Sequence, residues 1–354
     1  MTSVRRTTAV LPLLLVAMAC GPQTGTDGLP DGDRYLAASG RVRVGLIKMP
    51  YSGARNVAEL SGGPDYLESG GLLDRLADLD VELGPTSNVK LLADQEDDYG
   101  AWHRMGMANG HLAGLTAENE RGGRFTVALE SNCTSLLGVL AGLQDSSDSP
   151  RRVALVFIDA HGDFNTPEST LSGMLGGMPV AVAAGMCLTN LRHESGLDPA
   201  LPTRHVVMGA VRDTDPLEQR LIEQSDIRHI TVDDIRNGSE NIHRQMERLS
   251  ELADLIYIHI DMDVLDPREV AGHPLTVPNG PTSDELAAAL ETMFAYGKAA
   301  ALGIASTPWG RNDPDGLSRA AAYNLIDGAI RGVQARRQRD DAAAGAGPGQ
   351  SPVP

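Results

Sequence analysis

Short apolar runs alternate with amphipathic segments through most of the chain. Seven runs are short and apolar on both faces: 41–49, 124–129, 151–158, 204–210, 228–232, 254–260 and 300–306. Strands of this kind form the centre of a parallel sheet. Between them, segments such as 216–225 and 239–253 carry Leu, Ile and Met at three- and four-residue spacings, which predicts helices with one buried face. The pattern therefore predicts an α/β fold with a parallel sheet and helices on both of its faces.

The N-terminus departs from this pattern. Residues 1–20 carry two arginines near their start, Arg5 and Arg6, continue with an apolar stretch that is too short to span a bilayer, and end in small residues. This order is typical of a secretory signal peptide. The ending "VAMAC" resembles a bacterial lipoprotein signal, in which Cys20 would be lipidated; plain secretion is the alternative. The sequence thus predicts an exported protein, either a membrane-anchored lipoprotein or a periplasmic or extracellular protein.

Two further segments lack a pattern that can form a core. Residues 21–40 are rich in Gly, Asp and Pro and predict a flexible linker, and residues 336–354 predict a disordered, low-complexity tail. The folded unit is therefore expected at 41–335. The net charge of -17 argues against a nucleic-acid surface, which needs clusters of basic residues, and leaves carboxylates available for cations.

Ionisable residues follow two of the predicted strands. Each strand end presents alternating side chains that point the same way: Asp159, His161 and Asp163 after the first, Asp261 and Asp263 after the second. An isolated Asp-x-Asp is commonly a capped turn. Two such sets at the carboxyl ends of parallel strands, where ligands bind, favour a metal site. Four carboxylates with one imidazole suit divalent ions such as Mn²⁺, and five ligands are enough for two ions that share carboxylates.

Two segments carry a family resemblance. The stretches "DAHGDFNTPESTLSGMLGGMP" (159–179) and "IHIDMDVLDP" (258–267) resemble the two metal-binding signatures of the arginase and agmatinase family of ureohydrolases. The similarity extends over roughly 42–330. It implies a three-layer α/β/α sandwich with a mainly parallel sheet and a centre of two Mn²⁺ ions. It also implies a hydrolase in which a hydroxide that bridges the ions attacks the carbon of a C–N bond in a linear amidine.

The resemblance also assigns roles by position. It makes Asp159, His161, Asp163, Asp261 and Asp263 metal ligands. Asp163 would in addition be the catalytic residue that orients the hydroxide. Asn165 and Ser172 match positions that hold the carboxylate end of the substrate in arginases. Family members are commonly trimers or hexamers, which implies a homo-oligomer.

The first metal motif of the family, G-G-D-H-S, is changed in this chain. In "LESNCTS" (129–135), Cys133 stands at the position of the ligand His. A thiolate can bind a divalent ion, but it favours Zn²⁺, Fe²⁺ or Ni²⁺ over Mn²⁺ more than imidazole does. Two alternatives remain open from the sequence. Cys133 is either a small core residue beside a weakly held or missing ion, or the partner of Cys187 in a disulfide.

The substrate end of the family pattern is changed as well. Met174 and Gly176 replace an Asn and the His that shuttles protons in arginases, and His273 is a candidate replacement for that His. Ala305 or Ser306 stands where arginases have the Glu that pairs with the guanidinium. Its absence argues against arginine as the substrate, because a bidentate carboxylate partner contributes strongly to guanidinium binding.

Three apolar residues, Met174, Met178 and Trp309, are candidates for the pocket lining. They indicate a pocket more apolar than that of arginases, unless they are simple core residues. Taken together, the sequence predicts a divalent-metal hydrolase that acts on a small linear amidine or guanidino compound other than arginine. A non-catalytic lipoprotein of the same fold, serving as a binding or scaffold protein, is the alternative. Five of six ligand positions are kept while the pocket has changed, which favours altered specificity over lost activity.

Overall fold

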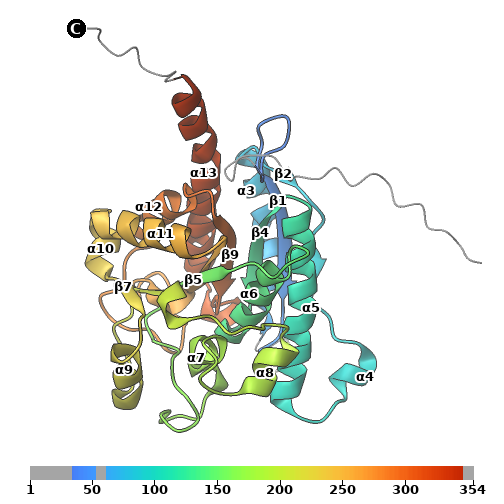
Figure 1. Ribbon diagram of the computed structural model, residues 1–354, viewed down its shortest axis with the longest axis vertical. Coiled ribbons are helices and arrows are strands. Elements are labelled where there is room, and N and C mark those ends of the chain that lie inside the picture. The colour runs from blue at the N-terminus through green and yellow to red at the C-terminus, as the bar shows by residue number, and fades with distance from the viewer. Residues whose placement is uncertain (1–33, 53–60, 346–354) are drawn as a thin grey trace, which may run out of the picture.

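The protein folds around one parallel sheet. The computed structural model describes residues 34–52 and 61–345 (Figure 1). The sheet has nine strands in the order β2-β1-β4-β9-β8-β5-β6-β7, with β3 paired to β1, and every pairing between them is parallel. The strands are β1 Arg43–Met49, β2 Glu82–Leu83, β3 Ser87–Asn88, β4 Phe125–Glu130, β5 Val153–Ile158, β6 Val206–Gly209, β7 Arg228–Ile230, β8 Leu255–Asp261 and β9 Ala299–Ala305.

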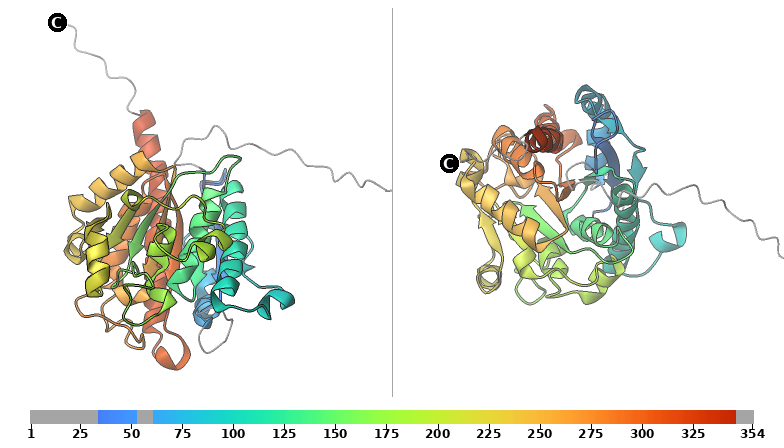
Figure 2. Two further views of the ribbon diagram at one scale, coloured as in Figure 1. Left: turned by 60° about the horizontal axis from the view of Figure 1, so that its bottom comes forward. Right: turned by 45° about the horizontal axis from the view of Figure 1, so that its top comes forward.

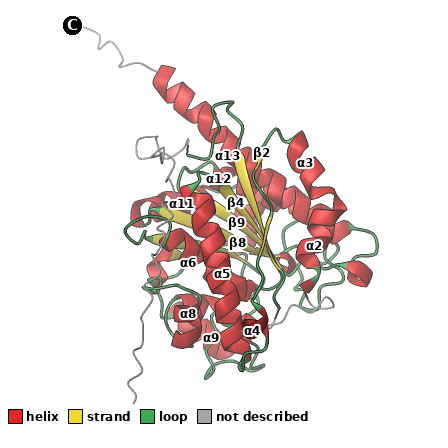
Figure 3. Ribbon diagram, turned by 90° about the vertical axis from the view of Figure 1, so that its right-hand side faces the viewer, coloured by secondary structure: helices red, strands yellow, loops and turns green. Residues whose placement is uncertain are grey.

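Helices cover both faces of this sheet. They are α2 Gly63–Leu67, α3 Leu73–Asp78, α4 Ala93–Glu96, α5 Ala101–Arg121, α6 Leu136–Gln144, α7 Pro179–Ala183, α8 Thr189–Glu194, α9 Pro216–Glu223, α10 Val232–Asn237, α11 Glu240–Leu252, α12 Ser283–Phe294 and α13 Leu317–Gly345. Helices α5, α6, α7 and α8 pack together on one side, and α10, α11, α12 and α13 on the other (Figure 2). Figure 3 shows the strands side by side between these helices. The predicted three-layer α/β/α sandwich is confirmed.

All seven predicted strands are present, because central strands carry long apolar runs. Every residue of β4, β5, β8 and β9 is buried. The hydrophobic pattern does not predict β2 and β3. Each of these has only two residues, which is too short for a periodic signal.

The folded unit begins earlier than the predicted boundary at residue 41. Tyr35 lies in the predicted linker but is fully buried, and its hydroxyl donates to Glu120 Oε2 at 2.6 Å. Leu36 forms an antiparallel bridge with Val42. The linker prediction is therefore wrong for residues 34–40, since one buried aromatic side chain anchors a segment whose composition is otherwise that of a linker.

The folded unit also ends later than predicted. Helix α13 continues to Gly345, inside the predicted disordered tail. Arg336 is buried and its guanidinium donates to the carbonyl oxygens of Phe294 and Ala299 at 2.7 and 2.6 Å. Backbone carbonyls therefore satisfy a buried cation that the tail's composition gives no reason to expect.

The predicted signal peptide, with Cys20, lies outside the described residues. Within residues 34–52 and 61–345, none of the helices combines the length and apolar character needed to cross a bilayer.

Candidate metal centre

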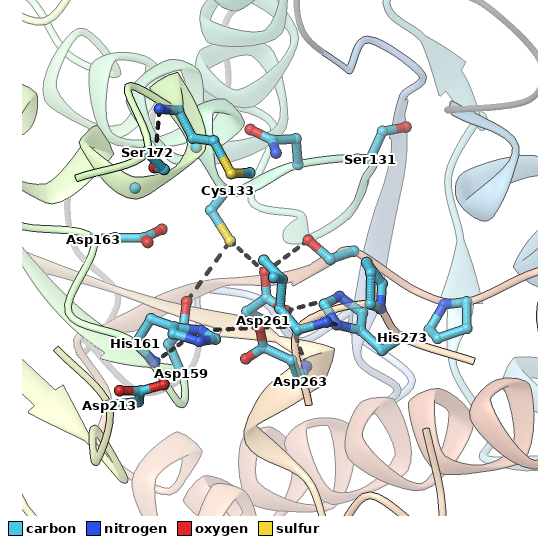
Figure 4. A pocket seen from close by; sticks show the side chains of 18 of the residues that line it. Ser131, Cys133, Asp159, His161, Asp163, Ser172, Asp213, Asp261, Asp263 and His273 are labelled. Atoms are coloured by element: carbon cyan, nitrogen blue, oxygen red, sulfur yellow. Dashed lines mark hydrogen bonds and ion pairs between the residues drawn. The ribbon is translucent and has the colours of Figure 1, made fainter. Parts of the chain in front are cut away.

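The two predicted ligand segments lie next to each other in the sheet. Strands β5 and β8 are paired, with Ile158 opposite Ile260, so Asp159 and Asp261 leave the same edge side by side. The side chains that follow both strands line one cavity of about 550 Å³ (Figure 4). The structure therefore brings together all five residues predicted from the strand ends: Asp159, His161, Asp163, Asp261 and Asp263.

Contacts within the cluster orient its carboxylates. His161 Nδ1 lies 3.1 Å from Asp263 Oδ2 and 3.4 Å from Asp159 Oδ1. Backbone groups contribute as well, since the His161 amide donates to Asp159 Oδ1 at 2.7 Å and the Asp263 amide to Asp261 Oδ1 at 2.9 Å. Each strand end thus uses one backbone N–H to fix the carboxylate two residues before it.

Cys133 joins the cluster from strand β4. It begins the 3₁₀ turn Cys133–Ser135, which is capped by Asn132 Oδ1 accepting from the Thr134 amide at 3.0 Å. Its Sγ lies 2.8 Å from Asp261 Oδ2 and 4.0 Å from Asp159 Oδ2. Cys133 and Cys187 are both free thiols, so the disulfide alternative is wrong. Strand β4 instead places the thiol beside the carboxylates.

Three overlapping sets of side chains have donor atoms within 4.8 Å of one another. They are Cys133 with Asp159 and Asp261, Asp159 with His161 and Asp263, and Asp261 with Asp263 and His273. Three aspartates each belong to two sets, as required if neighbouring ions share carboxylates. Asp163 belongs to none of them, although it lines the same cavity and has a left-handed backbone with φ 47°.

The charges in this cluster are not balanced by the protein alone. Burial, followed by repulsion from neighbouring aspartates, raises the pKa of Asp159 and of Asp163. Burial would lower the pKa of His161, but hydrogen bonds to Asp159 and Asp263 raise it to about 11. Buried carboxylates that hold protons when no cation is bound are suited to exchange them for divalent ions. The residues present therefore fit a metal centre.

The far wall of the cavity carries the predicted substrate-binding residues. Asn165 Nδ2 donates to Asp215 Oδ2 at 3.2 Å, and Asn165 Oδ1 accepts from Ser169 Oγ at 2.8 Å. Ser172 is exposed and lines the same cavity. The structure therefore places both predicted residues in the lining of the cavity, Asn165 buried and Ser172 exposed.

Three further acidic residues line this wall and are not among the site residues predicted from the sequence. The cavity is lined by Asp213 from the loop after β6, by Asp215 at the N-cap of α9 and by Glu218 in its first turn. Glu218 accepts from the Phe164 amide at 2.8 Å and from the Asp215 amide at 3.0 Å, so it ties the two loops together. The signal that could have found them is the acidic run "RDTDPLE" directly after a buried strand.

The changed family positions have different outcomes in the structure. Ser306 lines the cavity and its Oγ donates to Asp261 Oδ2 at 2.7 Å, whereas Ala305 is buried within β9. Met174 and Trp309 line the cavity, in agreement with a more apolar pocket. Met178 is 1% exposed and belongs to the hydrophobic core, so the alternative of a simple core residue holds for it.

A second polar network lies buried in the sheet behind the site. The Tyr257 hydroxyl lies 2.8 Å from Glu130 Oε1 and 2.8 Å from His259 Nδ1. Gly303 makes room for it, because a Cβ there would lie 2.0 Å from the Tyr257 hydroxyl oxygen. Burial raises the pKa of Glu130 to about 8 and lowers that of His259 to about 3. The apolar pattern of the strands does not predict this network.

Known proteins are similar to this chain in sequence. The sequence pattern of the Arginase family matches residues 44–305. An arginase of Bacillus caldovelox is 29% identical over 258 residues, 71% of this chain and 85% of that protein. An N(omega)-hydroxy-L-arginine amidinohydrolase of Streptomyces lavendulae is 33% identical over 178 residues, 50% of this chain and 59% of that protein.

Solved structures show the same fold. The crystal structure of arginase from Bacillus subtilis has a TM-score of 0.69 at 22% identity, covering 81% of this chain and 98% of that chain. Formimidoylglutamase from Bacillus subtilis has a TM-score of 0.62 at 17% identity, covering 90% and 96%. Since the family pattern spans the sheet from β1 to β9, including both metal-ligand segments, the chain belongs to the arginase family.

Proposed function

We propose that this protein is a divalent-metal-dependent hydrolase that cleaves a C–N bond in a linear amidine or guanidino-type compound other than arginine. The observation that carries the proposal is the meeting of β4, β5 and β8 at one cavity. There, Cys133 with Asp159 and Asp261, and His161 with Asp159 and Asp263, form two sets whose donor atoms lie within 4.8 Å of one another.

Six residues would hold two ions: Asp159, His161, Asp163, Asp261, Asp263 and Cys133. Mn²⁺ suits the carboxylates and the imidazole, and the thiol makes Zn²⁺, Fe²⁺ or Ni²⁺ further candidates. When bound, such ions lower the pKa of water and supply a nucleophile at neutral pH. Asp163 would accept a hydrogen bond from the attacking water and so orient it.

Different parts of the cavity would bind the two ends of the substrate. Asn165 and Ser172 offer donors, and Asp215 beside them offers a carboxylate, which together suit the carboxylate and ammonium of an amino-acid end. At the reacting end, Ser306 provides no carboxylate for a guanidinium. The related proteins named for hydroxyarginine and formimidoylglutamate make N-hydroxyguanidine and formimidoyl compounds the first substrates to test.

Metal analysis combined with a hydrolysis screen tests this function. The purified protein should bind close to two equivalents of a transition metal and release urea, hydroxyurea, formamide or ammonia from at least one guanidino, N-hydroxyguanidino or formimidoyl compound. Less than one equivalent of any transition metal would contradict the proposal. It would favour a non-catalytic protein of the same fold.

We also propose that the protein is exported and anchored through lipidated Cys20. The support is the order of charged, apolar and small residues in 1–20. Mass spectrometry of the N-terminal peptide from the native membrane fraction would show a diacylglyceryl group on Cys20. An unmodified N-terminus that starts before residue 20 would contradict this proposal.

A further inference from the structure

His273 approaches the cavity from a loop that holds none of the predicted ligands. The loop connects β8 to α12, and the His273 side chain is only 7% exposed. Its Nε2 lies 3.7 Å from Asp261 Oδ1 and its Nδ1 lies 3.9 Å from Asp263 Oδ2. Figure 4 shows the imidazole beside these two aspartates and on the opposite side of them from His161.

Backbone contacts hold this imidazole in place. Gly272 lies so close to the neighbouring loop that a Cβ on it would be 1.8 Å from the carbonyl oxygen of Asn312. The His273 amide donates to the Val270 carbonyl at 2.8 Å. Arg212 donates to the carbonyl of Val277 at 2.9 Å and so holds the far end of the loop. These contacts fix the loop that carries His273.

The hydrogen bonds of His273 define which ring nitrogen faces the cavity as a donor. The Leu275 amide donates to His273 Nδ1 at 3.2 Å, so the lone pair of Nδ1 is occupied. In a neutral imidazole the proton is then on Nε2. At 3.7 Å, Nε2 is too far from Asp261 Oδ1 for a hydrogen bond. The Nε2–H group is thus a donor available to a molecule in the cavity.

The reacting end of the cavity therefore offers an N–H donor from His273 and, at Ser306, no charged acceptor for a guanidinium. A guanidinium carries only N–H donors and has no acceptor atom. Ser306 offers only the lone pairs of a neutral hydroxyl, whose proton is directed to Asp261, and no charge to pair with a guanidinium. A neutral group that bears an oxygen or an unprotonated nitrogen can accept from His273 Nε2, whereas a guanidinium cannot.

We propose that His273 is a catalytic residue that donates a hydrogen bond from Nε2 to an acceptor atom on the reacting group. It would thereby select N-hydroxyguanidino, acyl or other acceptor-bearing C–N groups over guanidinium. This inference rests on the proposed hydrolase function and names the substrate class of the same site. No bond to His273 forms or breaks, because the residue only donates a hydrogen bond.

Two substitutions at His273 and one control test this role. His273→Ala removes the donor, and His273→Gln keeps an N–H on a side chain of similar reach. His193→Ala removes an imidazole that is 49% exposed on α8 and lines no part of the cavity, so it serves as the matched control. The probes are N-hydroxyarginine and arginine, which differ by one hydroxyl group whose oxygen can accept a hydrogen bond. Metal content, Kd and kcat/KM are measured for each metal-loaded variant.

We expect the wild-type protein and His193→Ala to prefer N-hydroxyarginine over arginine. His273→Ala should lose on the order of tenfold in affinity and kcat/KM for N-hydroxyarginine, with the values for arginine and the metal content unchanged. His273→Gln should recover part of the loss. An equal loss for both probes, no loss for either, or the loss of one metal equivalent would overturn the proposal, the last because His273 would then be a ligand.

Different results would contradict the hydrolase function and the donor role of His273. If the metal-loaded wild-type protein hydrolyses neither probe nor any compound of the screen, the hydrolase function fails, and the binding constants still test the donor role of His273. If the wild-type protein binds both probes equally or binds neither, the role of His273 is overturned even when another substrate is hydrolysed.

Discussion

Cys133 Sγ lies 2.8 Å from Asp261 Oδ2, so a thiol from β4 and a carboxylate from β8 meet across the end of β9. Burial, followed by the charges of Asp261, Asp163 and Asp159, raises the pKa of the thiol. In the metal-free protein the thiol therefore donates to Asp261. A soft metal that replaces this proton would bind both groups at once, so we expect Cys133 to influence the metal preference.

Exchanging the thiol for imidazole should change the metal that is bound. We expect Cys133→His to bind Mn²⁺ more tightly relative to Zn²⁺ than the wild-type protein does, because imidazole is the harder ligand. Cys133→Ala should weaken binding of one of two ions by about 10- to 100-fold or more. Competitive titration with Mn²⁺ and Zn²⁺ measures both effects. Cys187→Ala is the control, and an identical metal preference in all variants would remove Cys133 from the centre.

Substitution of Asp163 tests its predicted role in orienting the attacking water. Its left-handed backbone, with φ 47°, is tolerated by Asn, so Asp163→Asn should keep the local fold. Since the amide cannot accept a proton or bind an ion as strongly, we expect kcat to fall by about 10² to 10⁴-fold. Steady-state kinetics on the substrate found by the screen measures the fall. Asn165→Ala is the comparison, because its effect should be mainly on KM, and an unchanged kcat in Asp163→Asn would contradict the assigned role.

Much of this site follows from the sequence, because strand ends of a parallel sheet meet at one edge. Asp159, His161, Asp261 and Asp263 are such strand-end residues, and their alternation fixes the direction of their side chains. His273 could be proposed only as a loop residue of unknown position. Its place depends on the close approach of Gly272 to another loop, which one-dimensional patterns do not encode.

The buried polar residues of the fold cannot be predicted from the sequence for a different reason. Glu130 and His259 each stand in strands that read as continuous apolar runs, and neither alters the average hydrophobicity enough to be noticed. Tyr35 and Arg336 likewise sit in segments with the composition of a linker and a tail. Single buried anchors of this kind are determined by long-range packing, so composition over a window does not reveal them.

Removing metal should lower the stability of the whole domain. Ions that bind only the folded state stabilise it by RT ln(1 + [L]/Kd), or about 2.7 kcal/mol per site at a concentration 100 times Kd. We expect a chelator to lower the melting temperature by several degrees, and readdition of metal to restore it. Differential scanning calorimetry with and without metal tests this. A melting temperature that changes neither with the chelator nor with readded metal would contradict a bound metal centre.

The Glu130 network should make stability depend on pH. Burial raises the pKa of Glu130 in the folded protein to about 8, above its ordinary value of 4.5. A carboxyl with a raised folded pKa contributes stability that is fully present below 4.5 and is lost as pH rises through 8. Glu130→Gln cannot ionise, so it should keep this stability.

The comparison is best made on metal-free protein, where bound ions do not change with pH. We expect the free energy of unfolding of Glu130→Gln, relative to the wild-type protein, to rise by on the order of a few kcal/mol between pH 5 and pH 8. Its Oε1 can still accept from Tyr257, so the hydrogen bond to β8 is kept. Glu291→Gln, at an exposed position, is the control. Parallel pH profiles for Glu130→Gln and the wild-type protein would contradict a raised pKa of Glu130 in the folded protein.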